Sequence, residues 1–292
     1  MEHVTELVQG RRSVRTYDGR ELSAEDLKKL SSFMADLENP YGIPVECRLL
    51  DAKQQPLKCP AVSGTELFVG GKAKRAEHVE EAFGYSFELL VLYAQSLGIG
   101  TVWVGGTMDR AAFERAMALE KDEMMPCMSP LGYPAQKMSA KESLMRKGIK
   151  ADSRRPFETI FFDGAFKVPL TSEKAGALAH PLEMVRWAPS AVNRQPWRVV
   201  VKENAAHFYL RHTKGFVSEA VGDMQKIDMG IALCHFALAA EESGLNVRFS
   251  ISDPGIAMGP GTEYIASYTF SFKKNYKTRY TPCWARPRCP GR

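Results

Sequence analysis

Residues 82–99, AFGYSFELLVLYAQSLGI, are the stretch from which the fold of this chain can be read. Apolar side chains recur there at intervals of three or four residues, at Phe83, Phe87, Leu90 and Ala94. That spacing puts them on one face of a helix, and Gly98 follows where a glycine commonly ends one. The sequence therefore predicts a long core helix that ends shortly before a strand.

A second stretch repeats this pattern in the other half of the chain. Residues 228–245, DMGIALCHFALAAEESGL, align with residues 82–99 at a constant offset of 146 residues, so that Gly84 matches Gly230. The apolar positions again recur at helical spacing, and a glycine again follows the last of them. The repeat predicts a second core helix equivalent to the first.

Two further blocks repeat upstream of these helices. Residues 27–50 and 179–202 align at an offset of 152 residues. Each block has a helical pattern, a loop that ends in Pro44 or Pro196, and then a β-rich run. Because two pairs of blocks occur in the same order, the sequence predicts an internal duplication.

The composition indicates an ordinary globular protein. The chain has 292 residues, 45% hydrophobic and 25% charged, which is enough for a large core and two domains. No apolar run approaches the roughly 20 residues that a membrane span needs. The N-terminus lacks the basic and then apolar pattern of a signal peptide. We therefore expect no membrane partner and a cytoplasmic location.

The net charge of +5 belongs to one end of the chain. Residues 273–292 contain seven lysines and arginines and no acidic residue, which leaves 32 basic and 34 acidic residues elsewhere. The body therefore gives no sign of a nucleic-acid partner. The tail is rich in proline and like charge, so we expect it to be disordered and dispensable.

Cysteine and histidine spacing favours neither a disulfide scaffold nor a metal site. The six cysteines form no Cys-x-x-Cys pair, and the six histidines have no zinc-ligand spacing. Cys47 and Cys234 lie in apolar periodic segments and are expected in the core. Residues 98–103, GIGTVW, lack the last glycine of a dinucleotide-binding loop and follow a helix, which argues against a Rossmann site.

Two motifs carry the chemical information, and they stand about 170 residues apart. Residues 11–15 read RRSVR, and residues 188–197 read APSAVNRQPW. Between them lie LGYP at residues 131–134 and RRPFE at residues 154–158. The order of the four motifs is more specific than any one of them.

Together these motifs resemble the flavin-binding segments of the FMN-dependent nitroreductase family. The likeness extends over about residues 5–270, and it is closest to a subfamily whose chain is internally duplicated. It implies an α+β fold of two similar halves, each with a mostly antiparallel sheet and packed helices. In ordinary members, two subunits of a homodimer give the first and second motif to the same flavin. Since one chain carries both motifs, the resemblance implies a fused pseudo-dimer that can act as a monomer.

The halves are expected at residues 1–162 and 163–272, with the basic tail at 273–292. They differ in complementary ways. Residues 38–42, ENPYG, have no serine and asparagine at the positions of Ser190 and Asn193 in the second-half loop, and residues 163–169 have no arginine pair. A fused two-fold dimer can lose one of two equivalent sites and keep the other. The sequence therefore predicts one flavin pocket, at the interface of the halves.

By resemblance, Arg11 and Ser13 bind the flavin phosphate, and Arg155, with Arg154 as its alternate, closes it from the other end. Arg15 stands beside the ring edge where negative charge gathers when the flavin accepts a hydride, which is the electrostatic logic of an oxyanion hole. The second-half loop reaches the ring and the ribityl chain. The full candidate set is Arg11, Arg12, Ser13, Arg15, Val104, Gly105, Gly106, Arg154, Arg155, Pro189, Ser190, Ala191 and Asn193.

The activity implied by the resemblance is a two-step redox exchange. NADH or NADPH reduces FMN, and a small-molecule acceptor, such as a nitroaromatic, a quinone or a free flavin, then takes the electrons. Because the cofactor carries this chemistry, no catalytic residue of the protein is required. Two alternatives stay open: a flavin carrier or sensor without turnover, and a structural relic that has lost FMN.

Overall fold

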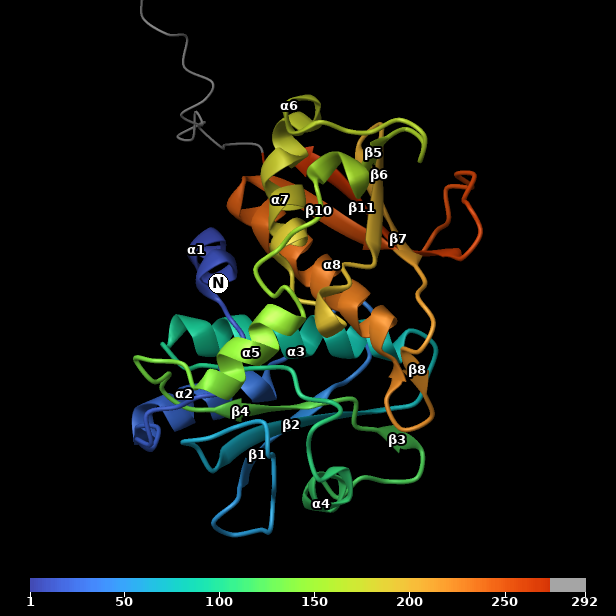
Figure 1. Cartoon of the computed structure of the whole chain (residues 1–292). Coiled ribbons are helices and arrows are strands. Elements are labelled where there is room, and N and C mark those ends of the chain that lie inside the picture. Colours follow the sequence, from blue (N-terminus) through green and yellow to red (C-terminus); the bar gives the residue numbers. More distant parts are fainter. Residues whose placement is uncertain (274–292) are drawn as a thin grey trace, which may run out of the picture.

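The computed structural model describes residues 1–273 (Figure 1). The prediction of a disordered tail over 273–292 therefore falls almost entirely on residues 274–292, which lie outside the described part. Among the described residues, no helix is both long and apolar enough to cross a membrane. The α+β class predicted from the sequence is confirmed by the helices and sheets of the structure.

The two predicted core helices are present and pack against each other. Helix α3 spans Val79–Ser96 and helix α8 spans Met224–Glu242. In Figure 1 they lie between a lower and an upper sheet. Each helix is followed by a glycine with positive φ, Gly98 (74°) and Gly244 (77°), which is a conformation that glycine adopts without strain.

Where α3 crosses α8, a glycine of each helix packs against the backbone of the other helix. A Cβ atom added to Gly84 would lie 2.1 Å from the carbonyl oxygen of Ile227. One added to Gly230 would lie 2.0 Å from the carbonyl oxygen of Glu81. The offset of 146 residues relates the two glycines and also relates Glu81 to Ile227. The close approach therefore requires glycine at both equivalent positions.

The first sheet is built around β2, Leu67–Lys74. Strand β2 pairs antiparallel with β1 (Glu46–Asp51), β3 (Glu123–Met124) and β4 (Met128–Leu131). Beyond β4, single antiparallel bridges at Gly100–Gly132 and Val104–Met128 continue the sheet to residues 100–104. The order across the sheet is thus β1, β2, β4 and residues 100–104.

The second sheet has the order β10-β11-β7-β6-β5. Its strands are β5 (Phe161–Asp163), β6 (Trp197–Lys202), β7 (Ala205–Arg211), β10 (Leu245–Ser250) and β11 (Thr262–Phe272). All pairs are antiparallel except β5 with β6. The order β6, β7, β11, β10 matches the order of the first sheet. The first two strands, β6 and β7, are consecutive in the chain like β1 and β2, and the strand that follows the core helix, β10, lies outermost like residues 100–104.

Shorter helices surround this framework. They are α1 (Val4–Gly10), α2 (Ala24–Ala35), α4 (Arg110–Ala116), α5 (Ala140–Gly148), α6 (Ser172–Ala175) and α7 (Ala179–Trp187). Single 3-10 turns occur at Phe157–Thr159, Gly176–Leu178 and Ala191–Asn193, and β8 (Val217–Ser218) pairs with β9 (Gly222–Asp223). Helix α1 packs against α3, α7 and α8, so it brings the chain start to the junction of the two sheets.

One buried apolar cluster extends through both sheets. It includes Phe83 and Phe87 of α3, Phe236 of α8, and Trp197 of β6. The proposed halves therefore share a core. The predicted boundary at 162/163 falls inside β5, which pairs with β6 of the second sheet, and the domain limits stay a prediction.

Candidate functional site

Four arginines gather where the end of α1, the segment that follows it, α5 and the loop after α5 meet. They are Arg11, Arg15, Arg146 and Arg154. Their charges act on one another: Arg146 contributes to lowering the pKa of the other three, and Arg11 also lowers that of Arg154. Like charges that act on one another in this way raise the free energy of the fold unless an anion offsets them.

Arg11 is the C-cap residue of α1 and has little access to solvent. Its side chain is 6% exposed, and its Nε lies 3.9 Å from Glu88 Oε1. Burial lowers the pKa of Arg11, while the charge of Glu88 opposes that effect. The buried Nε has no hydrogen-bond partner within residues 1–273.

Arg15 and Ser13 lie on the extended segment after α1. The segment is fixed by a parallel bridge between Ser13 and Thr101, and by the N–H of Val14, which donates to the Thr101 carbonyl at 2.9 Å. Burial lowers the pKa of Arg15, and the nearby charge of Glu142 opposes it. The buried Nη1 of Arg15 has no hydrogen-bond partner in the described part of the chain.

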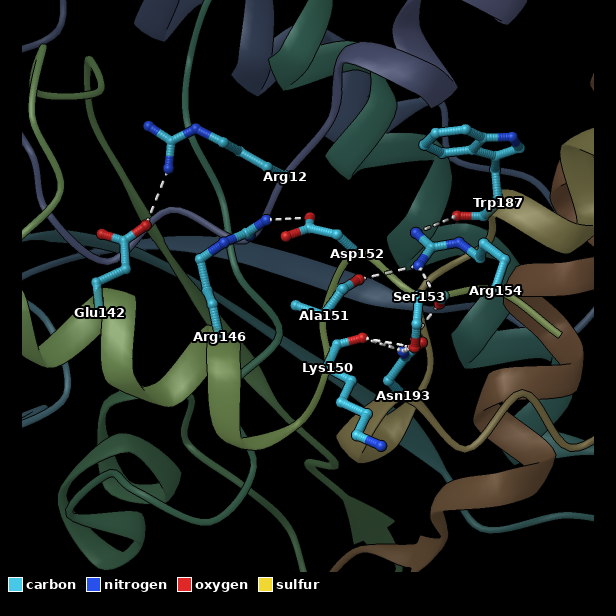
Figure 2. Close-up of polar contacts among 10 residues, drawn as sticks. All are labelled: Arg12, Glu142, Arg146, Lys150, Ala151, Asp152, Ser153, Arg154, Trp187 and Asn193. Atoms are coloured by element: carbon cyan, nitrogen blue, oxygen red, sulfur yellow. Dashed lines mark hydrogen bonds and ion pairs between the residues drawn. The ribbon is translucent and has the colours of Figure 1, made fainter.

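Arg154 is held by the loop after α5 and by the end of α7. Its Nη1 donates to the carbonyl oxygens of Ala151 (2.9 Å) and Ser153 (2.8 Å), and its Nη2 donates to that of Trp187 (3.4 Å). The guanidinium also lies over the Trp187 ring, 5.2 Å from its centroid (Figure 2). Its buried Nε is a third donor without a partner in residues 1–273.

Arg155 points to different neighbours. The residue is exposed, its N–H donates to Gln195 Oε1 at 2.8 Å, and its charge helps to lower the pKa of Arg198 on β6. Of the two arginines that the sequence offered as alternates, the structure therefore brings Arg154 next to Arg11.

The carboxylates around the cluster are fewer than its cations. Arg12 Nη1 pairs with Glu142 Oε1 at 2.9 Å, and Arg146 pairs with Asp152 (Figure 2). The same Glu142 also accepts the backbone N–H of Arg15 at 3.2 Å. Among the described residues, neither Arg15 nor Arg154 forms an ion pair with a carboxylate, so the cluster keeps excess positive charge.

The second-half loop reaches the first half through Asn193. Its amide Nδ2 donates to the carbonyl oxygens of Lys150 (2.7 Å) and Ser153 (3.1 Å), directly beside Arg154 (Figure 2). Ser190 Oγ accepts the N–H of Gln195 at 2.9 Å. These contacts join the second-half loop to the segment just before Arg154. The predicted contact of Ser190 and Asn193 with the flavin stays a prediction.

The remaining candidates of this loop fix its backbone. The N–H of Ala191 donates to the carboxylate of Asp228 at 3.0 Å, and Pro189 is half-buried beside it in the chain. Asp228 is completely buried on α8, and burial raises its pKa well above the ordinary value. The loop is therefore anchored to the central helix pair.

The residues 104–106 lie at the edge of the first sheet. Val104 is buried and bridges Met128, and the Gly105 carbonyl accepts Arg110 Nη2 at 2.6 Å. Gly106 is exposed, and an added Cβ there would meet no atom within 4 Å. The structure thus offers open space beside Gly106, next to a firmly held strand.

Two cavities adjoin the 52–68 segment. One, of about 280 Å³, is lined mainly by apolar residues and includes Cys59; the other, of about 470 Å³, lies beside the start of α2 and has mixed charges. Cys59 is near enough to Arg15 for that charge to lower the pKa of the thiol, although burial raises it overall. Residues 1–273 contain no group of three or more side chains arranged to hold a metal ion.

The comparisons with known proteins identify the family. A family model described as "Putative TM nitroreductase" matches residues 3–240. The chain belongs to this nitroreductase family. No curated protein matches it.

One solved structure shows the same fold as this nitroreductase-family protein over nearly the whole chain, and others are similar to about half of it. A Thermotoga maritima "putative nitroreductase" is 19% identical, with a TM-score of 0.56 over 91% of this chain and 93% of that one. An FMN-dependent nitroreductase of Clostridium difficile R20291 is 18% identical over 49% of this chain and 95% of its own, with a TM-score of 0.39. Iodotyrosine deiodinase, solved with FMN and 3-iodo-L-tyrosine, covers 47% of this chain at 14% identity and a TM-score of 0.39.

Arg146 is the site residue that sequence reasoning missed in this nitroreductase-family protein. A local signal was present: Ser139 begins α5 by accepting the N–H of Glu142, in the Ser-x-x-Glu pattern of a capping box. Glu142 and Arg146 are four residues apart and lie on the same helix face. That pattern could have predicted a charged face on α5. It could not have predicted which arginines of other segments lie beside that face.

Proposed function

We propose that this nitroreductase-family protein binds FMN and is an oxidoreductase that passes electrons from NADH or NADPH to a small oxidised acceptor. The observation that carries the proposal is the set of three buried donors without partners, Arg11 Nε, Arg15 Nη1 and Arg154 Nε. Buried polar groups are nearly always hydrogen-bonded in folded proteins. A phosphate monoester supplies several acceptor oxygens and a negative charge, so these residues fit that part of FMN.

The three arginines would have two roles: two would bind the phosphate, and the third would supply a fixed positive charge. Arg11 and Arg154 would hold the phosphate, since each buries an Nε that has no hydrogen-bond partner in residues 1–273. Arg15 would keep a fixed positive charge in a place with little water, where electrostatic interactions are strong. FMN, when bound, supplies the electron-transfer chemistry itself.

The acceptor would approach from the side of the 52–68 segment. The cavity of about 280 Å³ there is lined by Leu57, Val62 and Phe68 together with Lys58, Thr65 and Glu66, and Cys59 in its wall lies near Arg15. A mixed lining of apolar and polar groups suits flat aromatic molecules that carry polar substituents, such as nitroaromatics and quinones.

We also propose that the chain is a fused two-fold dimer that works as a monomer with one flavin site. Two observations support it: the reciprocal contacts of Gly84 and Gly230, and the equal strand order of the two sheets. Isologous contacts of this kind arise when the same surface packs on itself.

An aromatic cluster would fill the place equivalent to the proposed flavin site. At the offsets of the repeat, Tyr41 matches Asn193 and Phe249 matches Trp103. Tyr41 packs edge-on against Phe249, with ring centroids 4.8 Å apart, and lies 5.5 Å from the His78 ring. A large side chain thus stands where the second-half loop has the small amide of Asn193, which supports one site per chain.

Flavin binding and reduction test this proposal together. The purified chain should quench the fluorescence of added FMN, and anaerobic NADH or NADPH should then bleach the bound flavin. Bound flavin that resists both nucleotides would favour a carrier or sensor. Protein that takes up no FMN would favour a relic and would contradict the proposal.

A further inference from the structure

Glu88 and His235 form a buried polar pair where α3 and α8 pack together. His235 Nε2 lies 2.9 Å from Glu88 Oε1, and neither side chain has exposed surface. His235 Nδ1 lies 3.0 Å from the carbonyl oxygen of Met184 on α7, and Trp103 Nε1 donates to Glu88 Oε2 at 3.0 Å. Both carboxylate oxygens of Glu88 are therefore fixed in place.

The hydrogen-bond partners of Glu88 and His235 determine how many hydrogen atoms the two side chains carry together. A carbonyl oxygen can only accept, so Nδ1 of His235 carries a hydrogen that it donates to Met184. Nε2 and the Glu88 oxygen both have lone pairs, so their contact at 2.9 Å needs one further hydrogen between them. Whichever atom holds that hydrogen, Glu88 and His235 together are neutral.

Arg11 faces the same carboxylate oxygen. Its Nε lies 3.9 Å from Glu88 Oε1, which is too far for a hydrogen bond, and this Nε has no partner among residues 1–273. A neutral Glu88–His235 pair leaves the charge of Arg11 uncancelled. A Glu88 carboxylate without the second hydrogen would instead attract Arg11 and compete with any anion that Arg11 binds.

The pair also departs from the internal repeat. At the offset of 146 residues, Glu88 matches Cys234 and Leu89 matches His235. The equivalent positions on the other side of the helix pair thus carry neither the acid nor the base. The buried pair is found on the side of Arg11 and Trp103, where the arginine cluster lies.

We propose that His235 is a positioning residue for phosphate binding: by neutralising Glu88, it leaves Arg11 with its charge and its free Nε for the phosphate of FMN. This inference rests on the proposed function, because it concerns the same ligand. It adds that His235 on α8 controls the affinity of Arg11 for the phosphate through one buried hydrogen atom.

Binding of FMN and of riboflavin, which lacks the phosphate, tests the inference. In His235→Gln the neutral amide can donate to Glu88 but cannot supply the second hydrogen, so Glu88 is free to pair with Arg11. FMN affinity should fall about tenfold or more, while riboflavin affinity should stay near wild type. Adding Glu88→Gln to this variant removes the competing carboxylate and should restore FMN binding.

Each other outcome counts against the inference. Unchanged FMN affinity in His235→Gln, an equal loss for riboflavin, or no rescue in the double variant would overturn it. If His235→Gln does not fold, Glu88→Gln alone decides: it should bind FMN at least as tightly as wild type, and weaker FMN binding would refute the proposal. A wild-type chain that binds neither flavin would instead refute the proposed function.

Discussion

At the scale of single residues, the site is defined by donors that have no protein partner. Arg11, Arg15 and Arg154 each bury a nitrogen without a hydrogen bond in residues 1–273. Such an atom loses its hydration without compensation, which costs free energy unless a ligand supplies an acceptor. The cluster therefore favours an anion over an apolar molecule.

Arg11→Ala should weaken FMN binding about ten- to a hundredfold, because a hydrogen bond to a charged group contributes roughly 1.5–3 kcal/mol. The rise in melting temperature on adding FMN should shrink as well. Arg20→Ala is the control, since Arg20 is exposed, pairs with Asp18 and lies over the Tyr133 ring. Equal affinity in the two variants would show that Arg11 does not bind the phosphate.

Arg146→Gln should also weaken FMN binding, by about tenfold, because Arg146 adds positive charge beside all three free donors. Lys147→Gln removes the same charge from the next, exposed position of α5 and should have little effect. The two dissociation constants can be measured by flavin fluorescence at low and high salt. A loss of the same size in both variants would indicate general attraction rather than a site.

At the scale of elements, the helices and strands that follow periodic apolar patterns could be predicted, and the contacts between charged side chains could not. Helix α3 begins at Val79, three residues before the predicted stretch. Its N-cap His78 makes no side-chain hydrogen bond, so no capping signal marked this start in the sequence. Arg146 and Glu88 were missed because their partners come from other elements. Which elements meet depends on the packing of α3 on α8, which no local pattern encodes.

Gly230→Ala should destabilise the fold by about 1–3 kcal/mol or more, since the new methyl group would overlap the backbone of α3 at Glu81. Gly259→Ala is a matched control, because a Cβ there meets nothing within 4 Å. Urea unfolding of both variants measures the difference. A Gly230→Ala variant as stable as the control would contradict the close helix crossing.

The anchor of the second-half loop should make stability depend on pH. Burial raises the pKa of Asp228 in the fold, Ala191 opposes this through its hydrogen bond, and Asp223 adds to it. A raised folded-state pKa gives stability that is complete below the unfolded value and is lost as pH rises through the folded one. Asp228→Asn should therefore gain melting temperature relative to wild type as pH rises above about 4. A constant difference across pH 4–9 would disprove this.

At the scale of the whole molecule, the sequence indicated two related halves and one surviving site. The strand orders and the reciprocal glycine contacts support that plan, and the shared core explains why neither half needs its own. The packing of Tyr41 against Phe249, which we propose fills the second place, could not be predicted from residues 38–42, because their turn-forming composition does not encode their contacts with other elements.

The stoichiometry of flavin tests the central claim most directly. Purified chain should be saturated with FMN, freed of excess, and examined by light scattering for its mass, with protein and released flavin counted in the same sample. We predict a monomer with one FMN per chain. Two FMN per chain, or one FMN shared between two chains, would contradict a single site built from both halves of one molecule.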